Sequence, residues 1–206
     1  MNTQPPQEKP ENVRILSFCS PETIRTFSFS KSFGTFARYR SIYTRRESLE
    51  KLASKEGTNV TVAVDGTDTI IGFAVMDSPE DPERWSAVGR DAVIQIKSLE
   101  VIRKMRSKGI APALLKGLLA NPFIENKILI LVAYSWTWDL EGTDRSVPAY
   151  RNKLITLYSG FGFKEYPTND PNVCLKPENL FMARIGSKIG KETKKRFKWA
   201  CFGQTP

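Results

Sequence analysis

Residues 92–120, AVIQIKSLEVIRKMRSKGIAPALLKGLLA, contain the pattern of a β-strand, a basic turn and an α-helix in direct succession. In the first third, Val93, Gln95 and Lys97 alternate with Ile94, Ile96 and Ser98. This period of two predicts a strand. The last third predicts an amphipathic helix. Its apolar side chains recur at helical spacing, at Ile110, Ala113, Leu114 and Leu118. Residues 106–111 form the turn between the two elements.

This turn has the features of an anion-binding site. The N–H groups of a first helical turn point out of the helix end, where the helix dipole favours negative charge. Gly109 lacks the Cβ that would keep a phosphate away from the backbone, and Pro112 is harmless in the first turn. Five basic residues lie nearby: Lys97, Arg103, Lys104, Arg106 and Lys108. The alternative is an ordinary strand–turn–helix with a basic surface loop.

The turn resembles the acetyl-CoA-binding motif of the GCN5-related N-acetyltransferases (GNAT), which reads Gln or Arg, two residues, Gly, one residue, Gly or Ala. Arg106, Gly109 and Ala111 fit this pattern. The resemblance implies an α/β fold of the mixed α+β kind, with a central splayed mixed sheet and helices on both faces. It also implies acetyl-CoA as co-substrate. The binding residues would be Val101, Ile102, Arg106, Ser107, Lys108, Gly109, Ile110 and Ala111.

Length and composition favour a single domain. The 206 residues suit one sizeable core. We expect a disordered polar lead-in at residues 1–11, an N-acetyltransferase domain at 12–187 and a basic C-terminal helix or tail at 188–206. No apolar run approaches the roughly 20 residues of a membrane span. Three widely spaced cysteines and no apolar signal segment favour a reducing cytoplasm.

The absence of histidine and the charge distribution restrict the kinds of reaction and of partner that the sequence allows. With no histidine, a histidine-based triad and histidine metal ligands are excluded, and no metal is expected. The net charge is +9, and residues 184–198 hold seven basic residues against one acidic residue. A basic tail can indicate nucleic acid, but no nucleic-acid motif accompanies it. We therefore favour a solvated helix face or an acidic partner.

The remaining elements follow from periodicity and turn signals. Strands are predicted at 12–18, 60–64, 69–76, 127–134, 163–166 and 179–185, in addition to the strand of 92–120. Helices are predicted from Ser20 towards residue 33 and at 45–54, 147–158 and 191–200. The resulting order, βααβββαβαββ, matches the acetyltransferase fold. Residues 65–68, DGTD, predict a hairpin turn.

Amine acetylation requires a base for the amine proton, an N–H facing the developing oxyanion and an acid for the leaving thiolate. By resemblance, the N–H lies near Val101 and the acid is Tyr158, whose segment YSGFGF matches a late motif of the superfamily. A half-buried packing role for Tyr158 is the alternative. Many members of the superfamily place a glutamate base on the central strand where this chain has Gln95.

The base has three candidates. Glu100 is the only carboxylate on the central strand and is the first of them, although it could equally pair with Arg103 or Lys97. Asp139 and Glu141 follow the next strand, at the splayed end where substrates enter. Any of the three could act through a water molecule.

Two acidic loops could attract an ammonium-bearing substrate if they flank the cleft. The first loop contains Asp77, Glu80, Asp81 and Glu83, and the second contains Asp139, Glu141 and Asp144. Plain polar loops are the alternative. Trp136 and Trp138 either stack on the substrate or pack their loop against the core.

The C-terminal half resembles the acetoin-utilisation protein acetyltransferases of bacteria. The segment WDLEGT at 138–143 is its most specific match, and the resemblance spans roughly residues 71–187. It implies a cytoplasmic protein lysine N-acetyltransferase that acetylates and inactivates acetyl-CoA synthetase, with no nucleic-acid or membrane partner. The alternatives are a small-molecule amine N-acetyltransferase and a non-catalytic regulator that binds acetyl-CoA or a partner.

Overall fold

A computed structural model describes residues 12–34, 45–79, 82–89 and 91–204. The expected lead-in at 1–11 lies outside the described residues. The strands are β1 (Arg14–Leu16), β2 (Ser28–Phe29), β3 (Asn59–Val64), β4 (Thr69–Asp77), β5 (Val93–Val101), β6 (Ile128–Ala133), β7 (Lys164–Glu165) and β8 (Leu180–Ile185). The helices are α1 (Pro21–Arg25), α2 (Arg46–Ala53), α3 (Pro82–Ser86), α4 (Ile110–Leu118), α5 (Val147–Ser159), α6 (Pro171–Cys174) and α7 (Lys191–Ala200). Short 3-10 turns are η1 (Arg103–Met105), η2 (Pro122–Asn126) and η3 (Ser135–Thr137).

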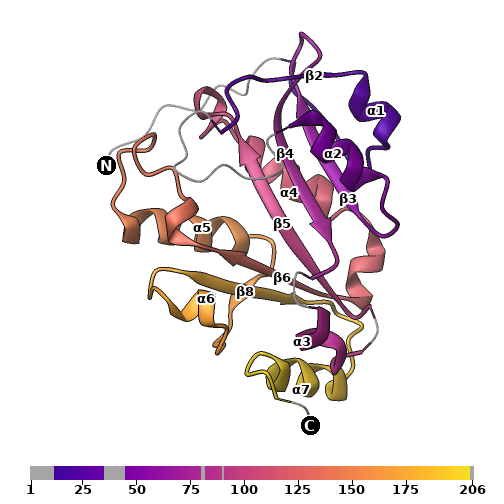
Figure 1. Ribbon diagram of the computed structural model, residues 1–206, viewed down its shortest axis with the longest axis vertical. Coiled ribbons are helices and arrows are strands. Elements are labelled where there is room, and N and C mark those ends of the chain that lie inside the picture. The colour runs from indigo at the N-terminus through magenta and orange to yellow at the C-terminus, as the bar shows by residue number, and fades with distance from the viewer. Residues whose placement is uncertain (1–11, 35–44, 80–81, 90, 205–206) are drawn as a thin grey trace.

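The strands form one mixed sheet in the order β1-β3-β4-β5-β6-β8-β7, with β2 parallel to the start of β4. Helices cover both of its faces (Figure 1). The predicted fold class is therefore confirmed. The elements expected from the sequence are present, and the hairpin at 65–68 joins β3 to β4 as expected.

Three short elements were not predicted. They are β2, α3 and α6, each of five residues or fewer, which is too short to show a periodicity. The helix expected from Ser20 towards residue 33 was too long. Ser20 does cap α1, its hydroxyl accepting a hydrogen bond from the Thr23 N–H, but the helix ends at Arg25. The Phe- and Ser-rich chain that follows becomes β2 instead.

The sheet splits between β5 and β6. These parallel strands pair only from Val93 to Ile96 against Ile128 to Leu131. Beyond that point, among the described strands, β5 continues beside β4 and β6 continues beside β8. The β4–β5 register shifts where Ile96 and Ser98 face consecutive residues of β4, so Lys97 is an extra residue in β5. A bulge of this kind bends its strand and increases its twist, so it turns β5 away from β6.

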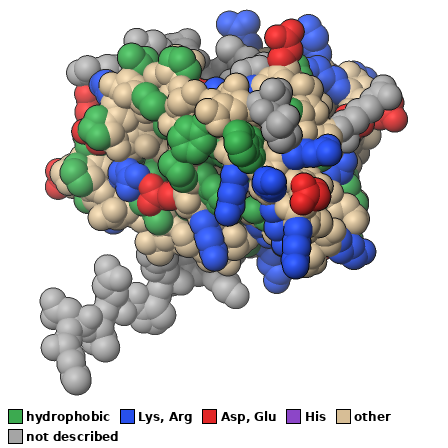
Figure 2. Space-filling model, turned by 90° about the horizontal axis from the view of Figure 1, so that it is seen from below, with side chains coloured by type: hydrophobic (Ala, Val, Ile, Leu, Met, Phe, Trp, Pro, Cys, Tyr) green, Lys and Arg blue, Asp and Glu red, His purple; other side chains and the backbone are tan. Residues whose placement is uncertain are grey.

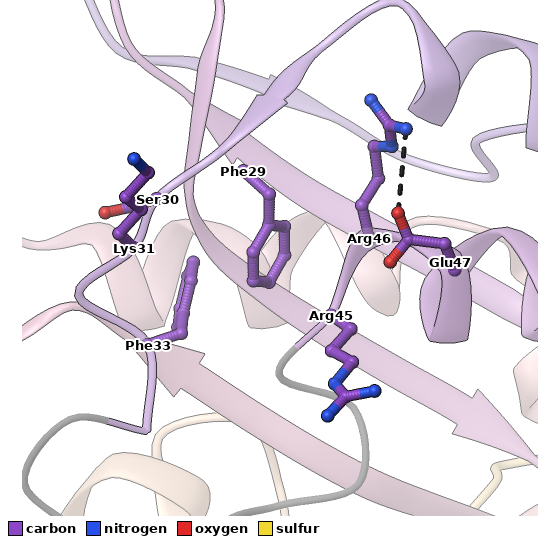
Figure 3. A pocket seen from close by; sticks show the side chains of 7 residues that line it. All are labelled: Phe29, Ser30, Lys31, Phe33, Arg45, Arg46 and Glu47. Atoms are coloured by element: carbon purple, nitrogen blue, oxygen red, sulfur yellow. Dashed lines mark ion pairs between the residues drawn. The ribbon is translucent and has the colours of Figure 1, made fainter.

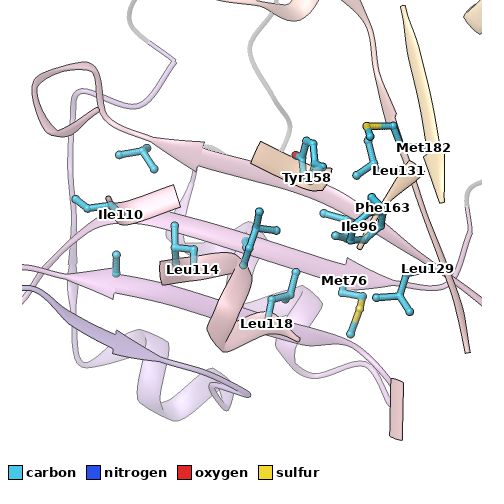
Figure 4. Packing of buried hydrophobic residues seen from close by; sticks show 14 of the residues in the cluster. Met76, Ile96, Ile110, Leu114, Leu118, Leu129, Leu131, Tyr158, Phe163 and Met182 are labelled. Atoms are coloured by element: carbon cyan, nitrogen blue, oxygen red, sulfur yellow. The ribbon is translucent and has the colours of Figure 1, made fainter. Parts of the chain in front are cut away.

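One face of the sheet packs against α4 and α5. The buried side of α4 is made by Ile110, Leu114, Leu115 and Leu118. These side chains lie over Met76 of β4 and Ile96 of β5, while Tyr158 of α5 packs beside Phe163 (Figure 4). The predicted helical stripe is largely confirmed, with Leu115 buried more completely than Ala113. Burial of these side chains, each worth about 1.5–3 kcal/mol, fixes the helix that follows the basic turn.

The opposite face is covered in two halves. Helices α1 and α2 pack over β3 and β4 through a cluster that includes Phe73. Helices α3 and α7 pack over β5, β6 and β8. The fully buried ring of Phe197 lies between Trp85, at 5.5 Å between ring centroids, and Tyr166, at 5.4 Å. The expected basic C-terminal helix is thus confirmed as α7, and its apolar side belongs to the core.

Arg84 joins α3 to the end of α7. Its Nε donates to the carbonyl of Ala200 at 3.0 Å and its Nη2 to the carbonyl of Cys201 at 2.8 Å. A guanidinium here satisfies carbonyls that a helix end leaves unpaired and complements the helix dipole. The solvent side of α7 is basic. Lysine and arginine side chains gather beside an apolar patch at this end of the molecule (Figure 2).

The fold is built without covalent cross-links between its cysteines. Cys19, Cys174 and Cys201 are all free thiols. Within the described ranges, no helix is long and apolar enough to cross a membrane. No group of three or more His, Cys, Asp or Glu side chains in the same ranges could hold a metal ion.

If α7 is part of the folded core, Phe197→Ala should lower the free energy of unfolding by about 3–5 kcal/mol, the usual cost of a buried Phe truncation. The neighbouring Lys198→Ala removes an exposed side chain and should change it by less than about 0.5 kcal/mol. Urea unfolding followed by circular dichroism measures both. Equal, small effects would mean that the core does not require α7.

Candidate active site

The turn between β5 and α4 leaves open space in front of its backbone. Ser107 and Gly109 both have positive φ angles, of 61° and 78°. Gly109 is the N-cap of α4, and a Cβ built on it would meet no heavy atom within 4 Å. Glycine is therefore needed for its backbone angle, not to avoid a neighbouring side chain. The first N–H groups of α4 face this space, which suits a phosphate.

The end of β5 turns one backbone N–H towards the split in the sheet. The Ile102 N–H donates to the carbonyl of Ile71 at 3.0 Å, and Val101 lies opposite Gly72. Backbone groups alternate in direction along an antiparallel strand. The Val101 N–H therefore points away from β4, to the side from which β6 has diverged. This is the orientation expected of an oxyanion donor.

Asp139 joins the loop after β6 to the segment after β5. Its carboxylate accepts hydrogen bonds from Arg103 Nη2 at 2.6 Å and Nε at 3.1 Å, and from Arg106 Nη1 at 2.5 Å. The Arg106 Nε also donates to the carbonyl of Val101 at 3.0 Å. Burial raises the pKa of Asp139, but hydrogen bonds from the two arginines outweigh it and hold this pKa below its usual range. An acid paired in this way is a poor proton acceptor.

Glu100 has the opposite electrostatic environment. It is half-buried on β5 and lies opposite Phe73 of β4. Burial raises its pKa, Arg106 counters part of this rise, and the negative charge of Asp139 adds to it. A carboxylate with a raised pKa is better matched to accepting a proton near neutral pH. Glu141, the third candidate base, is exposed.

Two tyrosines of α5 lie near these charges. Tyr158 is buried, with its ring 5.9 Å from that of Phe163, and burial raises its pKa, with contributions from Tyr150 and Glu100. Tyr150 is two helical turns earlier on the same side, and burial raises its pKa too. We did not predict a role for Tyr150. Its spacing of eight residues from Tyr158 in a predicted helix was the available signal.

The two acidic loops do not flank one site. Asp77 faces Gln95 near the start of β5, about 20 Å of strand from Val101. Asp77 accepts a hydrogen bond from Thr58 Oγ1 at 2.9 Å and pairs with Lys55. The expectation that both loops attract substrate is therefore wrong, because β4 and β6 end at opposite ends of the sheet. Glu80 and Asp81 lie outside the described residues.

The two tryptophans after β6 pack within the protein. Trp136 stacks on Tyr134 at 4.6 Å, and Trp138 stacks on Tyr150 at 5.2 Å. Trp138 thus packs its loop against α5, one of the two roles considered, whereas Trp136 stacks within its own segment.

A hollow of about 380 Å³ opens beside β2 and the start of α2. Figure 3 shows the side chains that line it. It is lined by Phe29, Ser30, Lys31, Phe33, Arg45, Arg46 and Glu47. The Phe33 ring lies 5.3 Å from that of Phe73, the residue opposite Glu100. Arg46 and Glu47 form an ion pair at 3.6 Å. The hollow thus has aromatic walls and more basic than acidic side chains.

Glu100→Gln should stabilise the protein at pH 7. The pKa of Glu100 is raised in the folded protein, so the unfolded chain ionises first as pH rises, and wild-type stability falls above the ordinary pKa of the carboxyl. Glutamine cannot ionise and avoids this loss. Thermal unfolding should show the gain at pH 7 and little difference below the ordinary pKa. The exposed Glu56→Gln is the control, and a gain of the same size in both variants would contradict the assignment.

The chain is similar to proteins of acetoin utilization. No family model matches it. It is 29% identical over 191 residues to the acetoin utilization protein AcuA of Bacillus licheniformis, covering 93% of this chain and 89% of that protein. The crystal structure of an acetoin utilization protein from Exiguobacterium sibiricum matches with a TM-score of 0.84 and 26% identity. That match covers 95% of this chain and 92% of the other.

A more distant structure shows the fold. A GNAT superfamily phosphinothricin acetyltransferase from Sinorhizobium meliloti, in complex with AcCoA, matches with a TM-score of 0.54 at 16% identity, over 84% of this chain and 88% of that one. These matches bear out the resemblance to the acetoin-utilisation proteins and the expected GNAT fold. The protein therefore has the GCN5-related N-acetyltransferase fold and is similar over nearly its whole length to the acetoin utilization protein AcuA.

Proposed function

We propose that the protein is an acetyl-CoA-dependent protein lysine N-acetyltransferase that acetylates and inactivates acetyl-CoA synthetase. The observation that carries the proposal is the convergence of three groups at one end of β5. An anion-binding helix start, a backbone N–H directed into the split sheet and a carboxylate with a raised pKa meet there. Acetyl transfer to an amine needs these three groups together.

The segment from the end of β5 to the start of α4 is suited to acetyl-CoA. The N–H groups around Gly109 would receive the pyrophosphate, and the basic side chains of the turn would complement its charge. The expected binding residues are Val101, Ile102, Arg106, Ser107, Lys108, Gly109, Ile110 and Ala111. Among them, Ile102 is buried and hydrogen-bonded to Ile71, so it positions the strand end.

We assign each catalytic step to one residue. Glu100, directly or through a water molecule, takes the proton of the lysine ammonium, and the freed amine attacks the thioester carbonyl carbon. The Val101 N–H donates to the carbonyl oxygen as it becomes negative. When the C–S bond breaks, the thiolate leaves with a proton from Tyr158, and the second proton lost by the attacking nitrogen restores the Tyr158 hydroxyl as the amide forms. Among the base candidates, the ion-paired Asp139 is the least suited, and the exposed Glu141 is second to Glu100.

The choice of a protein substrate rests on the relatives named for acetoin utilization. Acetylation removes the charge of a lysine, which would switch off a synthetase that uses this charge. The free cysteines fit a reducing cytoplasm. A small-molecule amine acetyltransferase is the second candidate, since the hollow beside Phe33 is open, although its basic side chains disfavour an ammonium group. A non-catalytic regulator is the third, since Gln95 occupies the usual base position.

The test is incubation with labelled acetyl-CoA and purified acetyl-CoA synthetase, followed by peptide mass spectrometry. We expect label on a lysine of the synthetase and loss of synthetase activity. Gly109→Asp, which places a negative charge where a pyrophosphate must bind, should abolish labelling without unfolding the domain. Labelling of small amines alone would favour the second candidate. Binding of acetyl-CoA with no transfer to any amine would favour the third.

Tyr158→Phe separates catalysis from packing. The change removes one proton donor and little volume, so turnover should fall by about 10- to 1000-fold. The affinity for acetyl-CoA, measured by calorimetry, should stay near that of the wild type. Wild-type turnover would assign Tyr158 to packing against Phe163.

A further inference from the structure

Arg103, Arg106 and Asp139 form one connected ion-pair group, here named the clasp. Asp139 is only 8% exposed, and its two oxygens receive three hydrogen bonds from the two guanidinium groups. The Gly142 N–H adds a fourth at 3.2 Å. Bidentate contact of the Arg103–Asp139 kind restricts orientation as well as distance. The carboxylate is therefore held in one position.

The clasp bridges the split in the sheet. Backbone pairing between β5 and β6 ends at Ile96 and Leu131. Further along, Arg103 and Arg106 follow β5, and Asp139 follows β6. The clasp thus connects the two diverging arms at the level of the anion-binding turn. Because Arg106 also donates to the Val101 carbonyl, it fixes the end of β5 and the start of the turn together.

The loop that carries Asp139 is shaped for this contact. A Cβ built on Gly142 would lie 2.0 Å from Arg103 Nε, a separation that no side chain can occupy. Glycine at this position lets the backbone approach the guanidinium closely enough for the Gly142 N–H to reach Asp139. The loop and Arg103 therefore fit each other directly.

We propose that Asp139 is a positioning residue, which through Arg103 and Arg106 holds the turn at 106–111 and the end of β5 in the geometry that binds acetyl-CoA. The inference rests on the proposed function. Asp139 touches neither the acetyl group nor the amine in this role. A preformed turn avoids the cost of ordering the loop at the moment of binding. The bridge also ties the loop after β6 to the cofactor side of the site.

The clasp also sets the charge around Glu100. Arg106 from the turn and Asp139 from the loop act on Glu100, which in turn acts on Tyr150 and Tyr158 of α5. Around these groups, Lys153 of α5 lies near Arg106 and Arg145, and Arg103 lies near Asp139 and Glu141. Phe73, which lies opposite on β4, is apolar. Removing the charge of Asp139 takes away a group that opposes ionisation of Glu100 and frees Arg106 to pair with it. Both changes favour the ionised form of Glu100.

The experiment compares Asp139→Asn with Asp144→Asn, which makes the same charge change at an exposed position five residues away. Hydrogen–deuterium exchange of the ligand-free proteins measures how well residues 103–111 are ordered. Calorimetry measures the affinity for acetyl-CoA. We expect Asp139→Asn alone to speed exchange there and to weaken binding by about 10- to 100-fold, as misplaced binding groups commonly do. The acidic limb of its pH–rate profile should also move to lower pH.

Gly142→Ala is the second variant, because it disturbs Arg103 without removing a charge. It should show faster exchange and weaker binding in the same direction, whether or not Asp139→Asn folds well. Unchanged exchange at 103–111 in both variants would overturn the proposal, as would faster exchange with wild-type affinity. If the pH–rate profile of Asp139→Asn lost its acidic limb completely while the affinity for acetyl-CoA stayed unchanged, Asp139 would be the base instead. If the wild-type protein bound no acetyl-CoA, the proposed function would be refuted. The hydrogen–deuterium exchange of residues 103–111 would then be the measurement that tests whether the clasp orders the turn.

Discussion

The extra residue at Lys97 is the constraint on which the site depends. Before it, β5 completes its hydrogen bonds with β4 on one side and β6 on the other. After it, β4 is the strand that pairs with β5 within the described ranges, and the N–H groups of β5 that point away from β4 face the side from which β6 has diverged. A sheet normally avoids unpaired edges. Here the unpaired edge lies inside the sheet, between two faces that helices cover. A bound molecule can form hydrogen bonds with this edge in place of a neighbouring strand.

The charged side chains at this edge form one group with as many basic as acidic members. Two arginines and two carboxylates meet where β5 and the loop after β6 approach each other. One carboxylate takes most of the positive charge and loses its tendency to accept a proton. The other, half-buried beside Phe73, keeps this tendency. Two chemically similar side chains thus acquire opposite pKa shifts from their surroundings, and a chain without histidine still presents a carboxylate that accepts protons more readily than usual.

The sequence was informative where the signal is local. The strand–turn–helix at 92–120, the cap at Ser20 and the helix at 191–200 depend on neighbouring residues, and all three were predicted. The pairing of Asp139 with Arg103 and Arg106 was not, because 36 and 33 residues separate the partners and only the fold brings them together. For the same reason the acidic loops were placed wrongly, since strand direction decides which loops share an end of the sheet.

The hydrogen bond from Arg84 to Ala200 spans 116 residues. A contact this distant along the chain closes a large loop, so it forms late in folding and slows it. Until α7 docks, the apolar face of β5, β6 and β8 beneath Trp85 and Phe197 stays uncovered. A chain in which α7 has not docked would therefore present strand surface to other chains, as exposed apolar surface does in aggregation-prone states. The basic solvent side of α7 acts against this through charge repulsion between molecules.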